Sequence, residues 1–221
     1  MISHFANRRV AGRDLALALT SLEIEDPIIF ALPRGGVPLG FEVAKQLKAP
    51  LDILLVRKIG APGHEEFGIG ALVDGASPQV VIDERTAKLA GADDAYIERE
   101  VQRQLAEVER RREAYGSGLS HSPRGRSVIV VDDGIATGGT VKAALKALRM
   151  AGASRIVLAV PVAPRSAIAE LRQYSDEIVC LAMPEPFYAV GAHYDDFSQT
   201  SDAEVIELLE SARQWAPSEQ A

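Results

Sequence analysis

The sequence predicts an α/β protein, with a doubly wound, mainly parallel sheet and helices on both of its faces. Five short runs are almost uniformly apolar and rich in Ile and Val, as is typical of strands covered on both faces. Segments of helical periodicity separate several of them, which favours parallel strands joined by right-handed crossovers. The expected strands are 27–32, 51–56, 128–131, 155–160 and 177–182, and the expected helices are 37–47, 140–151 and 164–173.

Composition excludes several classes of protein. The chain has 221 residues, 47% of them hydrophobic, and a formal net charge of -7. Because an acidic chain repels nucleic-acid backbones, we expect no nucleic-acid partner. No segment approaches the ~20 apolar residues needed to cross a membrane. A single cysteine, Cys180, lies in an apolar run and the first residues lack a signal-peptide pattern, so a cytoplasmic protein is expected.

Two stretches interrupt the alternation of strands and helices. Residues 57–83 are rich in glycine and contain Pro62, which indicates a mobile excursion followed by one or two short strands. Residues 93–115 are expected to form a highly charged helix with a thin apolar stripe, which lies on the surface or, as the alternative, makes a subunit contact. Near the chain end, Ser201 and Glu204 fit a helix capping box. We interpret residues 1–221 as one domain with an inserted flap at about 57–83.

The stretch VIVVDDGIATGGT, residues 128–140, carries the chemistry. A buried strand ends in two acids, and a turn rich in Thr and Gly then opens a helix. Glycines let backbone N–H groups approach an anion, and the helix N-terminus adds about half a positive charge, so a phosphate fits there. Carboxylates accept hydrogen bonds from vicinal sugar hydroxyls. The stretch therefore predicts a ribose 5-phosphate ligand; the alternative is the acidic strand end of another doubly wound fold, such as a receiver domain.

This pattern resembles the motif by which type I phosphoribosyltransferases bind 5-phosphoribosyl-1-pyrophosphate (PRPP). The whole chain resembles a bacterial group of predicted phosphoribosyltransferases whose acceptor is unassigned. The resemblance implies that Asp132 and Asp133 hold the ribose 2′- and 3′-hydroxyls. It also implies a loop that holds the 5′-phosphate, made of Ala136, Thr137, Gly138, Gly139 and Thr140. Ala136 stands where enzymes of 6-oxopurines usually have an acidic residue.

Two earlier segments gain roles from the same resemblance. The loop with Arg34, Gly35 and Gly36 would bind pyrophosphate through backbone N–H groups; its other interpretation is an ordinary strand-to-helix turn. Arg57 and Lys58 leave an apolar strand as adjacent cations, so they either meet pyrophosphate or form a solvated strand end. Residues 59–70 would be the flap that closes over the site during turnover.

The segment 183–205 is expected to form a small hood over the sheet, and it belongs to the same resemblance. It is rich in aromatic residues for this chain. Phe187 and Tyr188 either stack on a flat acceptor or pack the hood.

The activity implied by the resemblance is phosphoribosyl transfer from PRPP to an unidentified, nitrogenous small molecule, with release of pyrophosphate. Asp132, Asp133 and Lys58 would be catalytic, and Mg²⁺ would bridge pyrophosphate and ribose, contacting Asp132 and Asp133 through water. A role in nucleotide metabolism and a homodimer, usual in the family, are expected. Two alternatives stay open: a non-catalytic sensor of PRPP or a nucleotide on the same fold, and a hydrolase of phosphorylated sugars.

Overall fold

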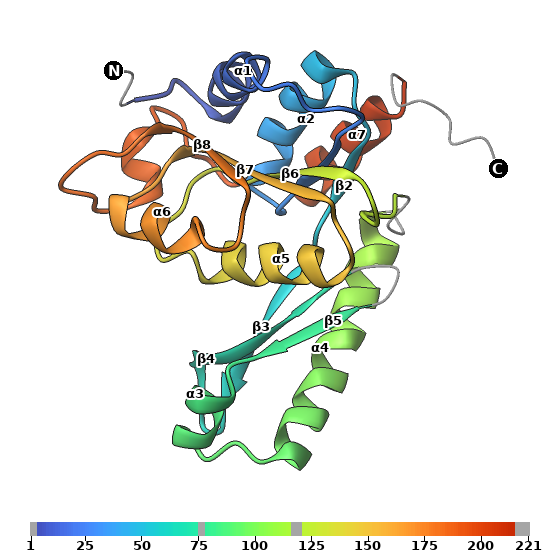
Figure 1. The fold of residues 1–221 in the computed structure, drawn as a ribbon, viewed down its shortest axis with the longest axis vertical. Coiled ribbons are helices and arrows are strands. Elements are labelled where there is room, and N and C mark those ends of the chain that lie inside the picture. The colour runs from blue at the N-terminus through green and yellow to red at the C-terminus, as the bar shows by residue number, and fades with distance from the viewer. Residues whose placement is uncertain (1–3, 75–77, 116–120, 215–221) are drawn as a thin grey trace.

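A five-stranded parallel sheet forms the body of the protein, seen in a computed structural model that describes residues 4–74, 78–115 and 121–214 (Figure 1). Its strand order is β2-β1-β6-β7-β8. The strands are β1 (Ile28–Ala31), β2 (Leu51–Ile53), β6 (Ser127–Val131), β7 (Arg155–Val162) and β8 (Glu177–Ala182). The predicted parallel sheet is confirmed, with β2 ending three residues earlier than the expected strand 51–56.

Helices cover both faces of this sheet, as predicted. One side carries α1 (Arg8–Leu19), α2 (Gly36–Leu47) and α7 (Asp202–Ala212), and the other carries α5 (Gly139–Met150) and α6 (Arg165–Leu171) (Figure 1). Side chains of a strand alternate between faces. Ile129 and Val131 of β6 therefore join the core on the α2 side, whereas Val128 and Val130 join the core on the α5 side.

Helix α1 was not among the helices expected from the sequence. The side chain of Asn7 caps it by accepting a hydrogen bond from Val10 N at 3.0 Å. A methyl group added to Gly12 would lie 2.8 Å from Leu39 Cα, so α1 and α2 pack at close range. The sequence did not predict this helix, because a central glycine and two arginines in the first turn are unfavourable to an isolated helix.

Residues 56–115, without 75–77, form a separate antiparallel lobe. It contains β3 (Val56–Ala61), β4 (His64–Val73) and β5 (Gln79–Ile82), joined in the order β3-β4-β5, together with α3 (Glu84–Leu89) and α4 (Asp94–Tyr115). The predicted flap at 57–83 is thus largely a three-stranded sheet, where a glycine-rich excursion and one or two short strands were expected; its residues 75–77 lie outside the described ranges. Helix α3 was not predicted.

The glycines of the lobe serve close packing between strands. A methyl group on Gly60 would lie 2.5 Å from Glu65 O, and one on Gly70 would lie 2.5 Å from Val81 O. The pairing of β3 with β4 also shifts register on both sides of Gly60. Glycine within strands marks bulges and close backbone approach as well as turns, and composition alone does not separate these uses.

Helix α4 confirms the helix expected at 93–115, and it is packed more closely than a surface helix. Ile97 and Val101 cover the core of the lobe, and the Tyr96 hydroxyl donates to Gly60 O at 3.0 Å. At its other end, Val108 and Tyr115 enter the core of the body. The helix therefore ties the lobe to the parallel sheet.

The hood segment 183–205 packs against the start of the chain. Phe5 N donates to His193 O, and Asp195 N donates to Phe5 O, both at 2.9 Å, beside the short helix η1 (Val190–His193). The Ser201 contact of the predicted capping box is present, since Glu204 N donates to Ser201 Oγ at 3.1 Å. Within the described ranges, no helix combines the length and apolarity required to span a bilayer. The interpretation of residues 1–221 as one domain stays a prediction.

The central strand offers a test of this packing. Because the Ile129 side chain is fully buried, Ile129→Ala is expected to lower the free energy of unfolding by about 3 kcal/mol through the cavity it leaves. Leu17→Ala is the control, since Leu17 is 63% exposed, and should cost less than about 0.5 kcal/mol. Urea denaturation measures both. Equal losses in the two variants would contradict the assignment of Ile129 to the core.

Candidate functional site

Two loops meet at the carboxyl edge of the parallel sheet, one after β1 and one after β6. Leu32 N donates to Val131 O at 2.9 Å, which aligns the strand ends. A methyl group on Gly35 would lie 2.0 Å from Oδ2 of Asp133, and one on Gly36 would lie 2.6 Å from Val131 O. Only glycine fits at either position. The structure thus brings the predicted pyrophosphate loop against the predicted sugar-binding acids.

The acidic pair is held in an enclosed position. Asp133 N donates to Oδ1 of Asp132 at 2.9 Å. Burial, followed by the charge of Asp133, raises the pKa of Asp132 well above its usual range. Burial also raises the pKa of Asp133, while Arg8 opposes that rise. Both shifts have the same origin, because a carboxylate withdrawn from water loses solvation of its charge.

Arg8 and Tyr194 complete the wall around Asp133, and the sequence analysis missed both. Arg8 Nε donates to Oδ2 of Asp133 at 2.8 Å, and the Tyr194 hydroxyl donates to Asp133 O at 2.6 Å. The contacts join residues separated by 125 and 61 positions, so no local motif contains them. One signal was available: Arg8 and Arg9 open a helix with no acid in its first turn, against the helix dipole.

One oxygen of each acid has a hydrogen-bond donor from the protein. Hydrogen bonds from the protein reach Oδ1 of Asp132 and Oδ2 of Asp133. Among the residues that the structure describes, none donates to the other oxygen of either group. The side chain of Asp133 is 15% exposed, so its carboxylate is not completely sealed from a small molecule.

The predicted phosphate loop leads from the acids into α5. Ile135 is buried, and its N–H donates to Val162 O at 2.9 Å, which fixes the loop to the end of β7. Gly138 has a left-handed φ of 80° and α5 begins at Gly139, so the turn needs glycine at 138. Ala136, Thr137, Gly139 and Thr140 are at least partly exposed. Their amides thus lie at an open helix N-terminus, the arrangement that suits an anion.

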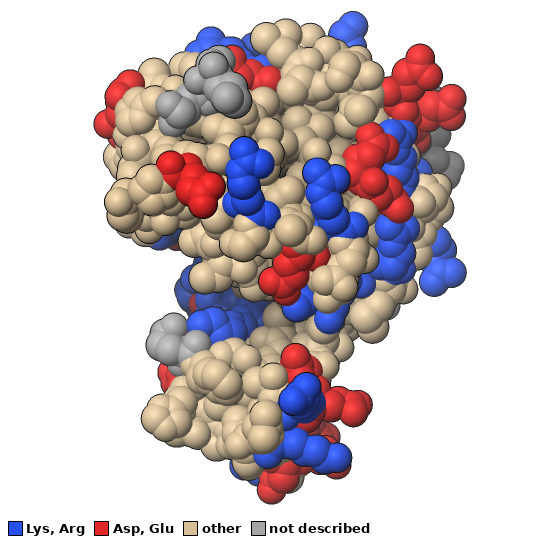
Figure 2. Space-filling view, turned by 60° about the vertical axis from the view of Figure 1, so that its left-hand side comes forward, with Lys and Arg blue, Asp and Glu red and all other residues tan. Residues whose placement is uncertain are grey.

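A cavity of about 470 Å³ runs between α5 and the antiparallel lobe and includes part of this loop. Lys58 lines it together with Thr137, Gly139 and Thr140. Further along α5 it is bordered by Lys142 and Lys146. Figure 2 shows Lys and Arg side chains gathered in the hollow between the body and the lobe. The structure therefore places Lys58 beside the phosphate loop.

Arg57 and Arg34 have protein partners. Adjacent residues of a strand face opposite sides, and Arg57 Nε donates to Gln104 of α4 at 3.1 Å, away from the cavity that Lys58 lines. Arg34 follows a cis peptide bond after Pro33, and its Nη1 lies 3.6 Å from Oδ1 of Asp202. Each guanidinium has further N–H groups, so these contacts leave the predicted pyrophosphate roles of Arg34 and Arg57 as predictions.

The two predicted acceptor residues lie in the hood. The ring of Phe187 stacks on His193, with centroids 5.4 Å apart, whereas Tyr188 is 82% exposed. The hood packs against the chain just after the acidic pair, because a methyl group on Gly134 would lie 2.5 Å from Val190. Phe187 therefore has a packing role, and Tyr188 is the accessible aromatic ring of the pair.

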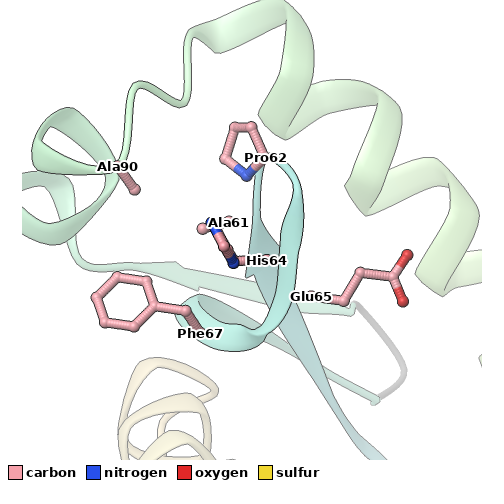
Figure 3. Close-up of a pocket in the computed structure, with 6 residues that line it drawn as sticks. All are labelled: Ala61, Pro62, His64, Glu65, Phe67 and Ala90. Carbon is pink, nitrogen blue, oxygen red and sulfur yellow. The ribbon is translucent and has the colours of Figure 1, made fainter.

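A second cavity, of about 820 Å³, lies at the tip of the β3–β4 hairpin. Figure 3 shows Pro62, His64 and Phe67 around it, with Ala90, the residue that follows α3, opposite. The tip points away from the parallel sheet (Figure 1). In this conformation the hairpin does not cover the acidic pair.

The donor set of this edge suits one kind of metal better than another. Over the described parts of the chain, no three His, Cys, Asp or Glu side chains are grouped so as to hold an ion. The acidic pair offers two adjacent carboxylates, each with one oxygen to which no described residue donates. This set fits Mg²⁺, which prefers oxygen ligands and keeps several waters, better than it fits zinc.

Comparison with known proteins identifies the family. The family described as "Phosphoribosyl transferase domain" matches residues 8–196. The chain belongs to this family. The resemblance inferred from residues 128–140 is thereby confirmed, and the matched range contains both loops of the edge, the antiparallel lobe and Arg8.

Two relatives support the assignment. A Mycobacterium tuberculosis protein named "Putative phosphoribosyl transferase Rv0571c" is 44% identical over 209 residues, which cover 94% of this chain and 47% of that protein. The chain thus spans about half the length of the curated relatives it matches. The crystal structure of TT1426 from Thermus thermophilus is 42% identical, with a TM-score of 0.84 over 96% of this chain and 99% of that one.

The contact between the two loops is testable through stability. Gly35 has helical φ and ψ, so Gly35→Ala adds no backbone strain and its cost reports the collision with Asp133. We expect a loss of about 1–3 kcal/mol in the free energy of unfolding. Gly139→Ala is the matched control, because nothing lies within 4 Å of its added methyl group, and it should be neutral or slightly stabilising. Urea denaturation giving equal values would refute the contact.

The buried acid gives a second prediction. The pKa of Asp132 is higher in the folded than in the unfolded state, so the fold binds the proton of Asp132 more tightly. This proton stabilises the fold fully at a pH below the unfolded-state pKa, and the stabilisation is lost as pH rises through the folded-state pKa. At about pH 7 the burial of this carboxyl group therefore lowers the free energy of unfolding of the wild type. Asp132→Asn removes that loss, and the new amide oxygen still accepts from Asp133 N. Thermal unfolding should show a higher Tm for the variant, by about 2–4 °C for each kcal/mol gained in the free energy of unfolding. The gain should vanish near about pH 4; a variant less stable at both pH values would contradict this cost.

Proposed function

We propose that this chain transfers the 5-phosphoribosyl group of PRPP to a nitrogenous small molecule and releases pyrophosphate. The observation that carries the proposal is the contact of Gly35 with Asp133. It joins a glycine loop suited to pyrophosphate with acids suited to a ribose diol. A third element, the open start of α5, follows the acids along the chain. Membership of the phosphoribosyl transferase family supports the same conclusion.

In this proposal the acidic pair holds the ribose. The ligand-facing oxygens of Asp132 and Asp133 accept hydrogen bonds from the 2′- and 3′-hydroxyls. Positive charge develops on the sugar ring as the bond to pyrophosphate breaks, and fixed carboxylates in an enclosed site stabilise it. The acceptor nitrogen forms its bond to the anomeric carbon on the opposite side, with inversion.

Phosphate groups at both ends of PRPP are bound by backbone and cations. The 5′-phosphate lies at the start of α5, where the accessible amides and the hydroxyls of Thr137 and Thr140 are available. Lys58 shares the cavity with Thr137 and supplies positive charge beside that loop. Pyrophosphate leaves along Gly35 and Gly36, with Arg34 and Arg57 as additional cations.

Asp132 and Asp133 would hold Mg²⁺ through water. When bound, the ion would neutralise the charge of the pyrophosphate leaving group. The protein's own contribution is to keep two carboxylates close together, each with one oxygen to which no described residue donates. Tyr188 in the hood is the exposed aromatic surface on which a planar acceptor would stack.

The test is pyrophosphate release from PRPP and Mg²⁺ with a panel of bases and amines, for the wild type and Asp133→Asn. The variant should keep its circular-dichroism spectrum and lose about 100-fold or more in kcat/KM, since it removes a charge that acts in the transition state. Asp195→Asn is the control, because that carboxylate is exposed and pairs with His4. Unchanged turnover in Asp133→Asn would overturn the proposed role. Tight PRPP binding without consumption across the panel would favour a sensor.

A further inference from the structure

We propose that the cavity between α5 and the antiparallel lobe binds the outer phosphates of a nucleoside 5′-triphosphate. The innermost phosphate occupies the loop at the start of α5, and Lys142 and Lys146 hold the phosphates beyond it. This inference rests on the proposed function only in taking that loop as a phosphate site. It adds a second class of ligand, one that competes with PRPP, to the same edge of the sheet.

The cavity continues past the phosphate loop along α5. Its volume of about 470 Å³ is within the range of small-molecule sites. Thr137, Gly139 and Thr140 line one part of it, and Lys142 and Lys146 line it further along the helix. The acidic pair and the glycines of the loop after β1 are not among its lining residues. A group bound beside the two lysines therefore lies beyond the 5′-phosphate, outside the part of PRPP that the acids would hold.

The cavity is basic although the protein is acidic. The formal net charge of the chain is -7, yet Lys58, Lys142 and Lys146 all line this one cavity. Within the described ranges, Asp83 is the one carboxylate that lines it, and it already accepts from Thr86 N at 2.9 Å as the cap of α3. Figure 2 shows the same concentration of Lys and Arg in the hollow between body and lobe. A local excess of positive charge favours an anionic ligand.

Two ammonium groups of this cavity lie beside one aromatic ring. Nζ of Lys142 lies 5.3 Å from the centre of the Tyr174 ring, and Nζ of Lys146 lies 5.1 Å from it. Lys142 also donates to Glu170 at 2.7 Å, whereas no carboxylate of the described chain pairs with Lys146. Like charges held near the same ring repel each other, and an anion bound to both would offset that repulsion. Because an ammonium has three N–H donors, Lys142 can serve Glu170 and a phosphate together.

The spacing of the two lysines suits a row of phosphates. At a rise of about 1.5 Å per residue, they lie about 4.5 Å and about 10.5 Å along the axis from Gly139, the first residue of α5. Residues four apart share one face of a helix, and their Cα–Cβ bonds tilt toward its N-terminus, here toward the phosphate loop. A monophosphate occupies only the loop, whereas the outer phosphates of a triphosphate extend along this face.

The experiment compares the wild type with Lys142→Gln, Lys146→Gln and the control Lys45→Gln. Calorimetry without added Mg²⁺ measures the binding of adenosine and guanosine 5′-monophosphates and 5′-triphosphates. The wild type should bind a triphosphate about tenfold or more tightly than its monophosphate, through the additional charge-assisted contacts. Each variant of an α5 lysine should lower that ratio about fivefold or more. Lys45→Gln removes the same charge from an exposed position of α2, across the parallel sheet (Figure 1), and should keep the wild-type ratio.

Competition with PRPP separates this inference from the proposed function. PRPP should displace the triphosphate, because both place a phosphate in the loop at the start of α5. A wild type that binds triphosphates through the two lysines, but neither binds nor consumes PRPP, would overturn only the proposed function. The triphosphate site itself would be refuted by absent triphosphate binding, by equal affinity for monophosphate and triphosphate, by an unchanged ratio in both lysine variants, or by simultaneous binding of PRPP and a triphosphate.

Discussion

The burial of two adjacent carboxylates at the end of β6 is the constraint that organises this protein. Each loses solvation of its charge, and each raises the cost of ionising the other. Two hydrogen bonds offset part of this cost: Asp133 N donates to the Asp132 carboxylate, and the Arg8 guanidinium donates to the Asp133 carboxylate. The absence of a side chain at position 35 follows from the same crowding, because the carboxylate of Asp133 fills that space. Such an arrangement lowers stability unless a ligand supplies further donors, which is the pattern expected at a functional site.

The wall around these acids is assembled from both ends of the chain. Arg8 belongs to α1, whereas Ser198 and Phe197, which orient it, follow the hood helix η1. Two backbone bonds of Phe5 hold the same two segments together. These contacts join residues far apart in the sequence, so they depend on the tertiary fold as well as on the local sequence. The geometry of Asp133 is therefore set by the whole fold, and the strand that carries it supplies only its position.

Much of the fold was predictable because its signals are local. The parallel strands are short buried runs, and residues 128–140 combine a strand, two acids and a glycine turn in a single stretch. The missed features depend on packing that the local sequence does not show. Helix α1 packs on α2 through Gly12, and Gly60 and Gly70 lie in strands where a neighbouring backbone approaches too closely for a side chain. Arg8 shows the same limit at the site. Its partner is 125 residues away. The one local signal of its role was the position of a cation in the first turn of a helix, which the helix dipole disfavours.

One carboxylate links the antiparallel lobe to the edge of the parallel sheet. Asp202, in the first turn of α7, accepts a hydrogen bond from the Tyr115 hydroxyl at 2.8 Å and lies 3.6 Å from Nη1 of Arg34. Tyr115 ends α4 and is buried, so its position follows that of the helix that supports the lobe. If Arg34 turns toward pyrophosphate, Asp202 loses a cation and retains the tyrosine. The two interactions converge on the same Oδ1, so this one carboxylate oxygen joins the end of α4 and the loop after β1 to the start of α7.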